Sequence, residues 1–417
     1  MNALACSLVA LLAAGPSAKS AAYKTAFTKW AENNDEASLA ATEKALDAWK
    51  AESPNDVEVW VACSNLRANQ AARNEAEEAK RLDEAIVCLK KGLAVAPARL
   101  DVHFGVLAVY RIGKRWPEIE TAAGALLTAA KAHENELTWR DGKPLPKPAN
   151  EFVPENVLGY ALDDQAPEDV AGRMVAAVTD AYPKCGECWN TRGGFLLRRD
   201  EATAAQMEEG LGYLKKSVAL LPTDLMVRTN LGINQLRAGH EADGLKTLEA
   251  VLRENPDERQ RTRAAQAAGP IWAKASPLKF HTAKLPPPAV PFTAPDGGPD
   301  LGTLGGWFAQ ALHLMGEGAS PKVVANAWCE AAGEPPPKVT TAPKLKASCA
   351  EWTKFAEKVE QGAQADLAKL KTLLAAPKTT CPQSRAAIFN WLESWPEAPD
   401  ALSEEVFGLY LQMKPCE

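Results

Sequence analysis

The sequence is poor in histidine and has no excess of positive charge. It contains 5 His in 417 residues, and 47 Lys and Arg stand against 53 Asp and Glu, which gives a net charge of −6. Five histidines are too few to indicate a histidine-built metal site. An acidic chain also lacks the positive electrostatic field of a nucleic-acid-binding protein. We therefore expect neither a metal nor a nucleic-acid partner.

Motifs of the common catalytic classes are missing as well. The sequence has no P-loop, no dinucleotide-binding glycine fingerprint, no G-x-S-x-G elbow and no H-E-x-x-H helix. Acidic residues are plentiful, but runs such as Glu75-Ala76-Glu77-Glu78 are typical of solvated helix faces. We therefore expect a protein that is not an enzyme and needs no cofactor.

The longest apolar run is too short to cross a bilayer. It extends almost unbroken from Leu4 to Gly15 and is followed by small residues from Ser17 onward. This pattern predicts a secretory signal peptide over residues 1–22, with cleavage between Ala18 and Ala22. The basic start that such signals usually have is missing, so a buried N-terminal helix is the alternative. We expect a protein exported to the periplasm, the extracellular space or the cell surface, with no transmembrane span in the mature chain.

Prolines divide the middle of the chain into units of helical hairpins. Pro222 and Pro256 lie 34 residues apart, and Gly239 separates two helical patterns between them. Counting back from each proline places Trp189 and Gly193 in the preceding unit where large and small side chains are expected. Three successive units all carry glycine at the same repeat position. These units end at Pro183, Pro222 and Pro256. This pattern resembles the tetratricopeptide repeat (TPR), a helix–turn–helix unit whose neighbours must stack to bury their apolar faces.

The resemblance implies an all-α solenoid of about six hairpins over residues 23–272. An insertion, His133–Asn150, interrupts it and carries a hairpin turn signal at Asp141-Gly142. Trp139 and Arg140 precede this turn, either as exposed ligand contacts or within a spacer.

The resemblance also implies a concave groove lined by the first helix of each hairpin. The family's carboxylate clamp, Lys at repeat position 5 with Asn at position 9, is not matched here. Two arginines at equivalent positions instead favour an anionic or hydrogen-bonding peptide. We expect a non-catalytic scaffold or adaptor of the cell envelope that binds a peptide or partner protein. Its oligomeric state is not predicted, and its candidate groove residues are Asn156, Tyr160, Asn190, Arg198, Thr229, Asn230, Ile233 and Arg237.

The C-terminal part of the chain has a different composition. Residues 273–303 are rich in proline and glycine and predict a linker, and residues 304–417 predict a small helical domain. Tryptophans of such a domain are more often core residues than ligand platforms. A cell-wall glycan-binding module is the alternative. The five tryptophans concerned are Trp307, Trp328, Trp352, Trp391 and Trp395.

Cysteines are even in number once the signal is removed. Of 9 Cys, Cys6 lies in the predicted signal, which leaves eight for disulfides in an oxidising compartment. The repeat register places Cys63 opposite Cys88 within one hairpin, which favours a disulfide between them. Two buried thiols are the alternative. Cys185 and Cys188 form a C-x-x-C motif, for which we favour a structural disulfide over a thiol–disulfide oxidoreductase site. The favoured pairs are Cys63–Cys88, Cys185–Cys188, Cys329–Cys349 and Cys381–Cys416.

Overall fold

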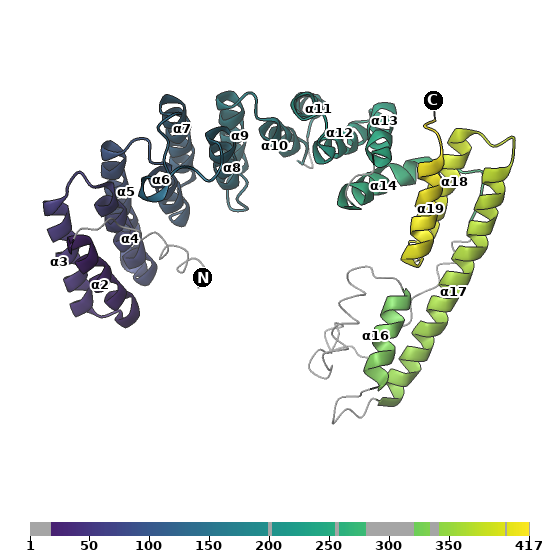
Figure 1. Cartoon of the computed structure of the whole chain (residues 1–417), viewed down its shortest axis with the longest axis horizontal. Helices are drawn as coiled ribbons and strands as arrows, with labels where there is room; N and C mark the ends of the chain where they lie inside the picture. The colour runs from purple at the N-terminus through teal and green to yellow at the C-terminus, as the bar shows by residue number, and fades with distance from the viewer. Residues whose placement is uncertain are drawn as a thin grey trace. The chain divides into compact units, whose positions relative to one another are not determined.

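The computed structural model describes residues 18–198, 202–254, 258–280, 321–333, 342–396 and 398–416 (Figure 1). Most of the predicted signal, residues 1–17, and the stretch 281–320 lie outside these residues, and with them Trp307 and much of the predicted linker. The predicted all-α fold class is confirmed. Within the described residues the one extended pairing is an isolated bridge between Arg99 and Thr138.

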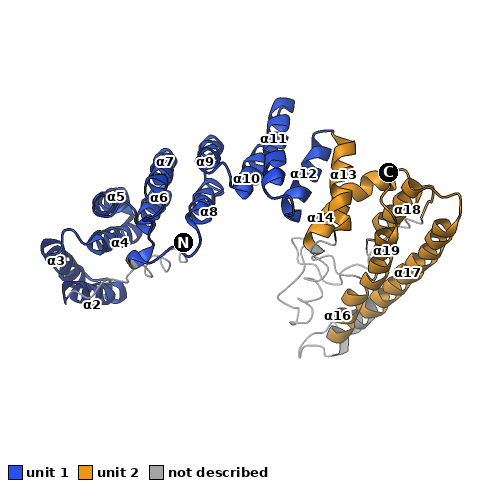
Figure 2. Cartoon of the chain, turned by 45° about the horizontal axis from the view of Figure 1, so that its top comes forward, with its two compact units in different colours: residues 1–239 blue, residues 240–417 orange. Residues whose placement is uncertain are grey.

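The chain divides into two compact units, residues 1–239 and residues 240–417 (Figure 2). Unit 1 is built from antiparallel helix pairs. Its helices are α2 Ala18–Asn33, α3 Glu36–Glu52, α4 Val57–Arg73, α5 Glu78–Val95, α6 Leu100–Ile112, α7 Trp116–Ala132, α8 Ala149–Ala161, α9 Glu168–Ala181, α10 Gly186–Leu197, α11 Ala204–Leu220 and α12 Leu225–Arg237. Short 3₁₀ turns lie at η2 Glu75–Glu77 and η3 Arg140–Gly142.

Unit 2 contains one further helix pair and the C-terminal helices. Its elements are α13 Glu241–Arg253, α14 Glu258–Ala273, α16 Pro321–Gly333, α17 Ala342–Ala375, α18 Cys381–Ser394 and α19 Asp400–Gln412. The indole of Trp272 on α14 packs against Phe389 on α18, with ring centroids 4.7 Å apart. The closing helix α14 and α13, the second helix of the last predicted repeat unit, therefore belong to one compact unit with the C-terminal helices. This division does not coincide with the predicted one, which put the boundary in the linker.

Local sequence explains where many helices begin. Asp35, Asp56 and Asp224 each accept a hydrogen bond from a backbone N–H of the first turn of the helix that follows. Thr203 and Gln206 form a reciprocal capping box at the start of α11. These side chains satisfy backbone donors that an α-helix leaves unpaired at its N-terminus.

Small residues let the two helices of a hairpin approach closely, as in TPR-like units. A Cβ added at Gly193 on α10 would lie 2.8 Å from the backbone oxygen of Gly210 on α11. A Cβ added at Gly210 would lie 2.7 Å from Cγ of Leu197. In the same hairpin, the buried Ser217 hydroxyl of α11 donates to the Gly186 carbonyl of α10 at 2.6 Å. Larger side chains at either glycine would push the helices apart.

The core of unit 1 continues from one hairpin to the next. One cluster of buried side chains extends from Leu100 on α6 to Cys188 at the start of α10. Aromatic residues fill the N-terminal hairpin of α2 and α3, and the buried Tyr23 hydroxyl donates to the Ala62 carbonyl of α4 at 3.0 Å. Each hairpin thus covers the apolar side of its neighbour, which is what gives stacked repeats their stability.

The tryptophans of the C-terminal helices are core residues. Trp328 and Trp391 are fully buried, and Trp352 and Trp395 are nearly so. Trp391 donates to the Ala363 carbonyl at 3.2 Å, which joins α18 to α17. Buried rings cannot offer a face to a sugar, so these four residues give no support to a glycan-binding module.

Candidate functional site

The candidate site is the face formed by the first helices of three successive hairpins, α8, α10 and α12, which we call the first-helix face. All three belong to unit 1, and α10 contacts both α8 and α12 (Figure 1). The predicted groove residues come from these helices. The face therefore carries equivalent positions of successive hairpins side by side.

Two asparagines join α10 to α12. The side-chain amide of Asn230 donates to the side-chain oxygen of Asn190 at 3.0 Å. Both residues are half-buried. A carboxamide carries both hydrogen-bond donors and an acceptor, which are the groups that pair with the backbone of an extended peptide.

Arg198 and Arg237 lie at the C-terminal ends of α10 and α12. Both are exposed, and neither forms an ion pair with another described residue. Cations are favoured at helix C-termini because the backbone carbonyls there carry partial negative charge. The two guanidinium groups therefore supply positive charge at the same end of neighbouring helices.

The remaining predicted groove residues differ in accessibility. Asn156 is half-buried and its amide donates to the Phe152 carbonyl of its own helix at 2.7 Å. Ile233 is half-buried on α12. Tyr160 donates to the Phe104 carbonyl at 3.4 Å, and burial raises the pKa of its phenol. The phenol therefore stays neutral near pH 7 and acts as a hydrogen-bonding group.

Thr229 does not belong to the accessible face. It is 0% exposed, and its hydroxyl donates to the Leu225 carbonyl at 2.6 Å. Its assignment to the groove is corrected on this ground, because a fully buried threonine whose hydroxyl bonds its own helix cannot contact a ligand.

Trp139 is also placed differently from the expectation of an exposed contact. Its ring is half-buried and packs against Phe104 and Phe152. Arg140 is exposed, with its guanidinium carbon 5.5 Å from the Trp139 ring centroid. The turn signal at residues 141–142 does produce a tight reversal, since Gly142 has φ 70° and the Trp139 N–H donates to the Lys143 carbonyl at 2.7 Å.

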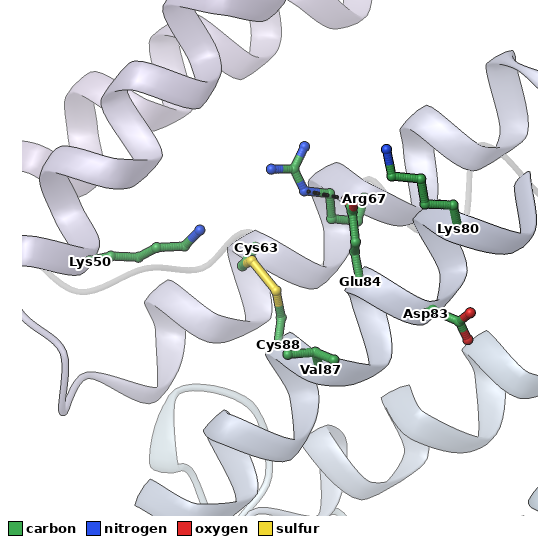
Figure 3. A pocket seen from close by; sticks show the side chains of 8 residues that line it. All are labelled: Lys50, Cys63, Arg67, Lys80, Asp83, Glu84, Val87 and Cys88. Carbon is green, nitrogen blue, oxygen red and sulfur yellow. Dashed lines mark ion pairs between the residues drawn. A yellow bond between two sulfur atoms is a disulfide. The ribbon is translucent and has the colours of Figure 1, made fainter. Parts of the chain in front are cut away.

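A pocket of about 600 Å³ lies elsewhere on unit 1, between α3, α4 and α5 (Figure 3). Its charges are largely paired: Arg67 contacts Glu43 at 2.5 Å and Glu84 at 3.2 Å, and Asp83 pairs with Arg115. The residues that α5 contributes recur three and four positions apart, so helical spacing in the sequence places them on one helix face. The lining residues are Lys50, Cys63, Arg67, Lys80, Asp83, Glu84, Val87 and Cys88.

Eight cysteines form four disulfides. Cys63–Cys88 joins α4 to α5, Cys329–Cys349 joins α16 to α17, and Cys381–Cys416 ties the start of α18 to the end of the chain. Cys185–Cys188 lies at the N-terminus of α10, where the Cys188 N–H donates to the Cys185 sulfur at 3.2 Å. Cys188 is 1% exposed, which leaves Cys185 as the more accessible sulfur.

The described residues hold no group of three or more His, Cys, Asp or Glu side chains arranged to bind a metal ion. In the same residues no helix is both long and apolar enough to span a membrane.

No family model matches the chain, and no curated protein matches it either. Several solved structures are similar at low scores. YrrB, described as a TPR protein with an unusual peptide-binding site, shares 14% identity over 53% of this chain and 98% of its own, with a TM-score of 0.30. The assembly chaperone of RpL4 (Acl4) shares 14% identity over 62% of this chain and 99% of its own, with a TM-score of 0.30. The TPR domain of P58(IPK) shares 11% identity over 95% of this chain and 100% of its own, with a TM-score of 0.25. Such scores carry no weight, so the hairpin assignment depends on the contacts described above.

Proposed function

We propose that this protein is a non-catalytic scaffold that binds an extended peptide segment of a partner protein along the first-helix face of α8, α10 and α12. The observation that carries the proposal is the amide pair Asn190–Asn230, with an exposed arginine at the same end of each of the two helices. Amides hydrogen-bond to a peptide backbone in register, whereas arginines attract side chains of opposite charge.

The preferred partner segment is acidic. Guanidinium groups bind carboxylates through paired, charge-assisted hydrogen bonds. Arg198 and Arg237 are exposed and form no ion pair with other described residues, so a carboxylate would not have to displace a described partner. Asn156 and Tyr160 extend the face toward α8 with further polar groups.

A selection of peptides from a random display library, on the purified chain, tests this proposal. The selected peptides should be rich in Asp and Glu, and the double variant Arg198→Glu, Arg237→Glu should lose their binding. The matched control is Lys90→Glu with Lys215→Glu, which makes the same change of charge at exposed lysines on the second helices α5 and α11. Equal binding by both double variants would rule out the arginines as the recognition element.

We also propose that the protein acts after export, in an oxidising compartment. Four disulfides support this, because such bonds persist outside the cytosol. Mass spectrometry of the protein isolated from cells without reductant should find the eight cysteines in pairs. Free thiols at these positions in the native material would contradict this location.

A further inference from the structure

The insertion between α7 and α8 lies back across the start of α6. We call residues 133–148 the strap. Thr138 pairs with residues 98–100, which lead into α6, through main-chain hydrogen bonds: its N–H donates to the Ala98 carbonyl at 3.1 Å, and its carbonyl accepts from the Leu100 N–H at 3.0 Å. This is the pairing that an extended peptide makes when it adds to a free backbone edge.

The strap also inserts an aromatic anchor between two first helices. Trp139 packs edge-on against Phe104 of α6, with ring centroids 6.0 Å apart, and against Phe152 of α8, at 5.0 Å. The two phenylalanines lie 6.0 Å from each other, at 87°. Aromatic anchors that fill a site between helices usually provide most of the binding energy of a peptide.

The rest of the strap shapes this anchor. A tight turn at residues 140–142 directs the chain back, with the Trp139 N–H donating to the Lys143 carbonyl at 2.7 Å. Leu137 and Leu145, on either side of the turn, pack against the same apolar cluster. Lys147 forms an ion pair with Glu155 of α8 at 2.8 Å.

We propose that the strap is a built-in ligand, which occupies a peptide-binding site across α6 and α8. It supplies what a bound peptide would supply: main-chain pairing, one large aromatic ring and flanking apolar side chains. The site therefore fits an extended segment with a tryptophan or another aromatic residue, and such a segment of a partner would compete with the strap. This inference concerns a different stretch of unit 1 from the arginine-bearing helices and does not rest on the proposed function.

Binding of the strap in trans tests the proposal. Residues 135–147 are replaced in the full chain by a Gly-Ser linker of equal length, and a synthetic peptide of residues 135–147 is titrated in. The replaced chain should bind this peptide, and a peptide with Trp139→Ala should bind roughly tenfold or more weakly, because it lacks the anchor. The unaltered chain, whose site is filled, should bind neither peptide. A folded replaced chain that fails to bind the strap peptide would overturn the proposal.

A second measurement covers the case in which the replaced chain does not fold. In the full chain with Trp139→Ala, hydrogen exchange should quicken at the amides of Thr138 and Leu100 by roughly tenfold or more, while the rest of α6 and all of α8 stay protected. A ligand can leave without unfolding its receptor. Loss of protection along α6 and α8 together with the strap would make the strap an integral part of the core, and that result would overturn the proposal.

Discussion

At the scale of single residues, two adjacent glycines of α10 have opposite surroundings. A Cβ at Gly193 would meet the Gly210 backbone oxygen and the Leu214 side chain within 3 Å, whereas a Cβ at Gly194 would meet nothing within 4 Å. One glycine is required by packing, and the other only lowers helix propensity. The pair separates the two effects within one helix.

We expect Gly193→Ala to destabilise the chain by about 1–3 kcal/mol, because the helices must separate to admit the methyl group. Gly194→Ala should stabilise it by about 0.5–1 kcal/mol through helix propensity. Urea unfolding followed by circular dichroism measures both. Equal effects of the two substitutions would show that α10 and α11 do not pack as closely as described.

His103 on α6 gives a pH dependence. Burial lowers the pKa of His103 below its ordinary value of 6.5; the Pro97 carbonyl and Asp101 act in the opposite direction, and His133 adds to the lowering. The unfolded chain therefore binds a proton at a higher pH than the folded chain does. Stability is complete above pH 6.5 and falls as the pH drops from there through the lowered folded value.

We expect the free energy of unfolding to decrease between about pH 7.5 and about pH 5.5, and His103→Gln to reduce this decrease. Glutamine is uncharged over this range and can still donate to the Pro97 carbonyl. Denaturant melts at both pH values test the prediction. The same decrease in both proteins would assign the pH dependence to other groups.

At the scale of elements, the C-terminal tail of unit 2 is held at two points. Arg253 of α13 donates to the Met413 carbonyl at 2.6 Å and to the Lys414 carbonyl at 3.4 Å. Cys416 is bonded to Cys381 at the start of α18. The guanidinium and the disulfide thus fix the same short segment after α19.

We expect Cys416→Ser to expose the tail after Gln412 to carboxypeptidase and to cost about 2–4 kcal/mol of stability, as the loss of a loop-closing disulfide does. The matched control is Cys349→Ser, which removes the disulfide between α16 and α17 at a similar cost in stability. Only the first substitution should release the tail. Release by both would mean that general destabilisation, not the local bond, governs it.

How far the sequence predicts an element depends on the range of the contacts that fix it. Prolines, caps and helical periodicity are local, and they predict the paired helices. The position of Trp139 depends on Phe104 and Phe152, which belong to two other elements, so the turn signal alone left its environment open. Thr229 was misplaced because the helical register does not say how far a side chain is covered by its neighbours.

At the scale of the whole molecule, the division into units depends on contacts between distant segments. Trp272 of α14 packs against Phe389 and Tyr410, and Arg385 of α18 contacts Glu249 at 2.5 Å. These partners lie more than a hundred residues apart in sequence. Composition marks the proline-rich stretch before residue 304, but it cannot reveal that a helix on the other side of this stretch packs with the C-terminal helices.

We expect a fragment of residues 240–417 to unfold cooperatively, because it keeps α13 and α14 with their partners. A fragment of residues 274–417 should be less stable by about 3–5 kcal/mol, since it loses the ring of Trp272 from the core of unit 2. Thermal melts of the two fragments make the comparison. Equal melting temperatures would place the boundary of this unit after α14.

Photo-crosslinking tests whether the first-helix face receives the partner peptide. A photoreactive phenylalanine is placed at Ile233 on α12 or, in a matched protein, at Val87, which is 53% exposed beside the pocket of α3 to α5. An acidic peptide selected on the unaltered chain is then added and irradiated. We expect covalent capture from position 233 and none from position 87. Capture from position 87 alone would contradict it.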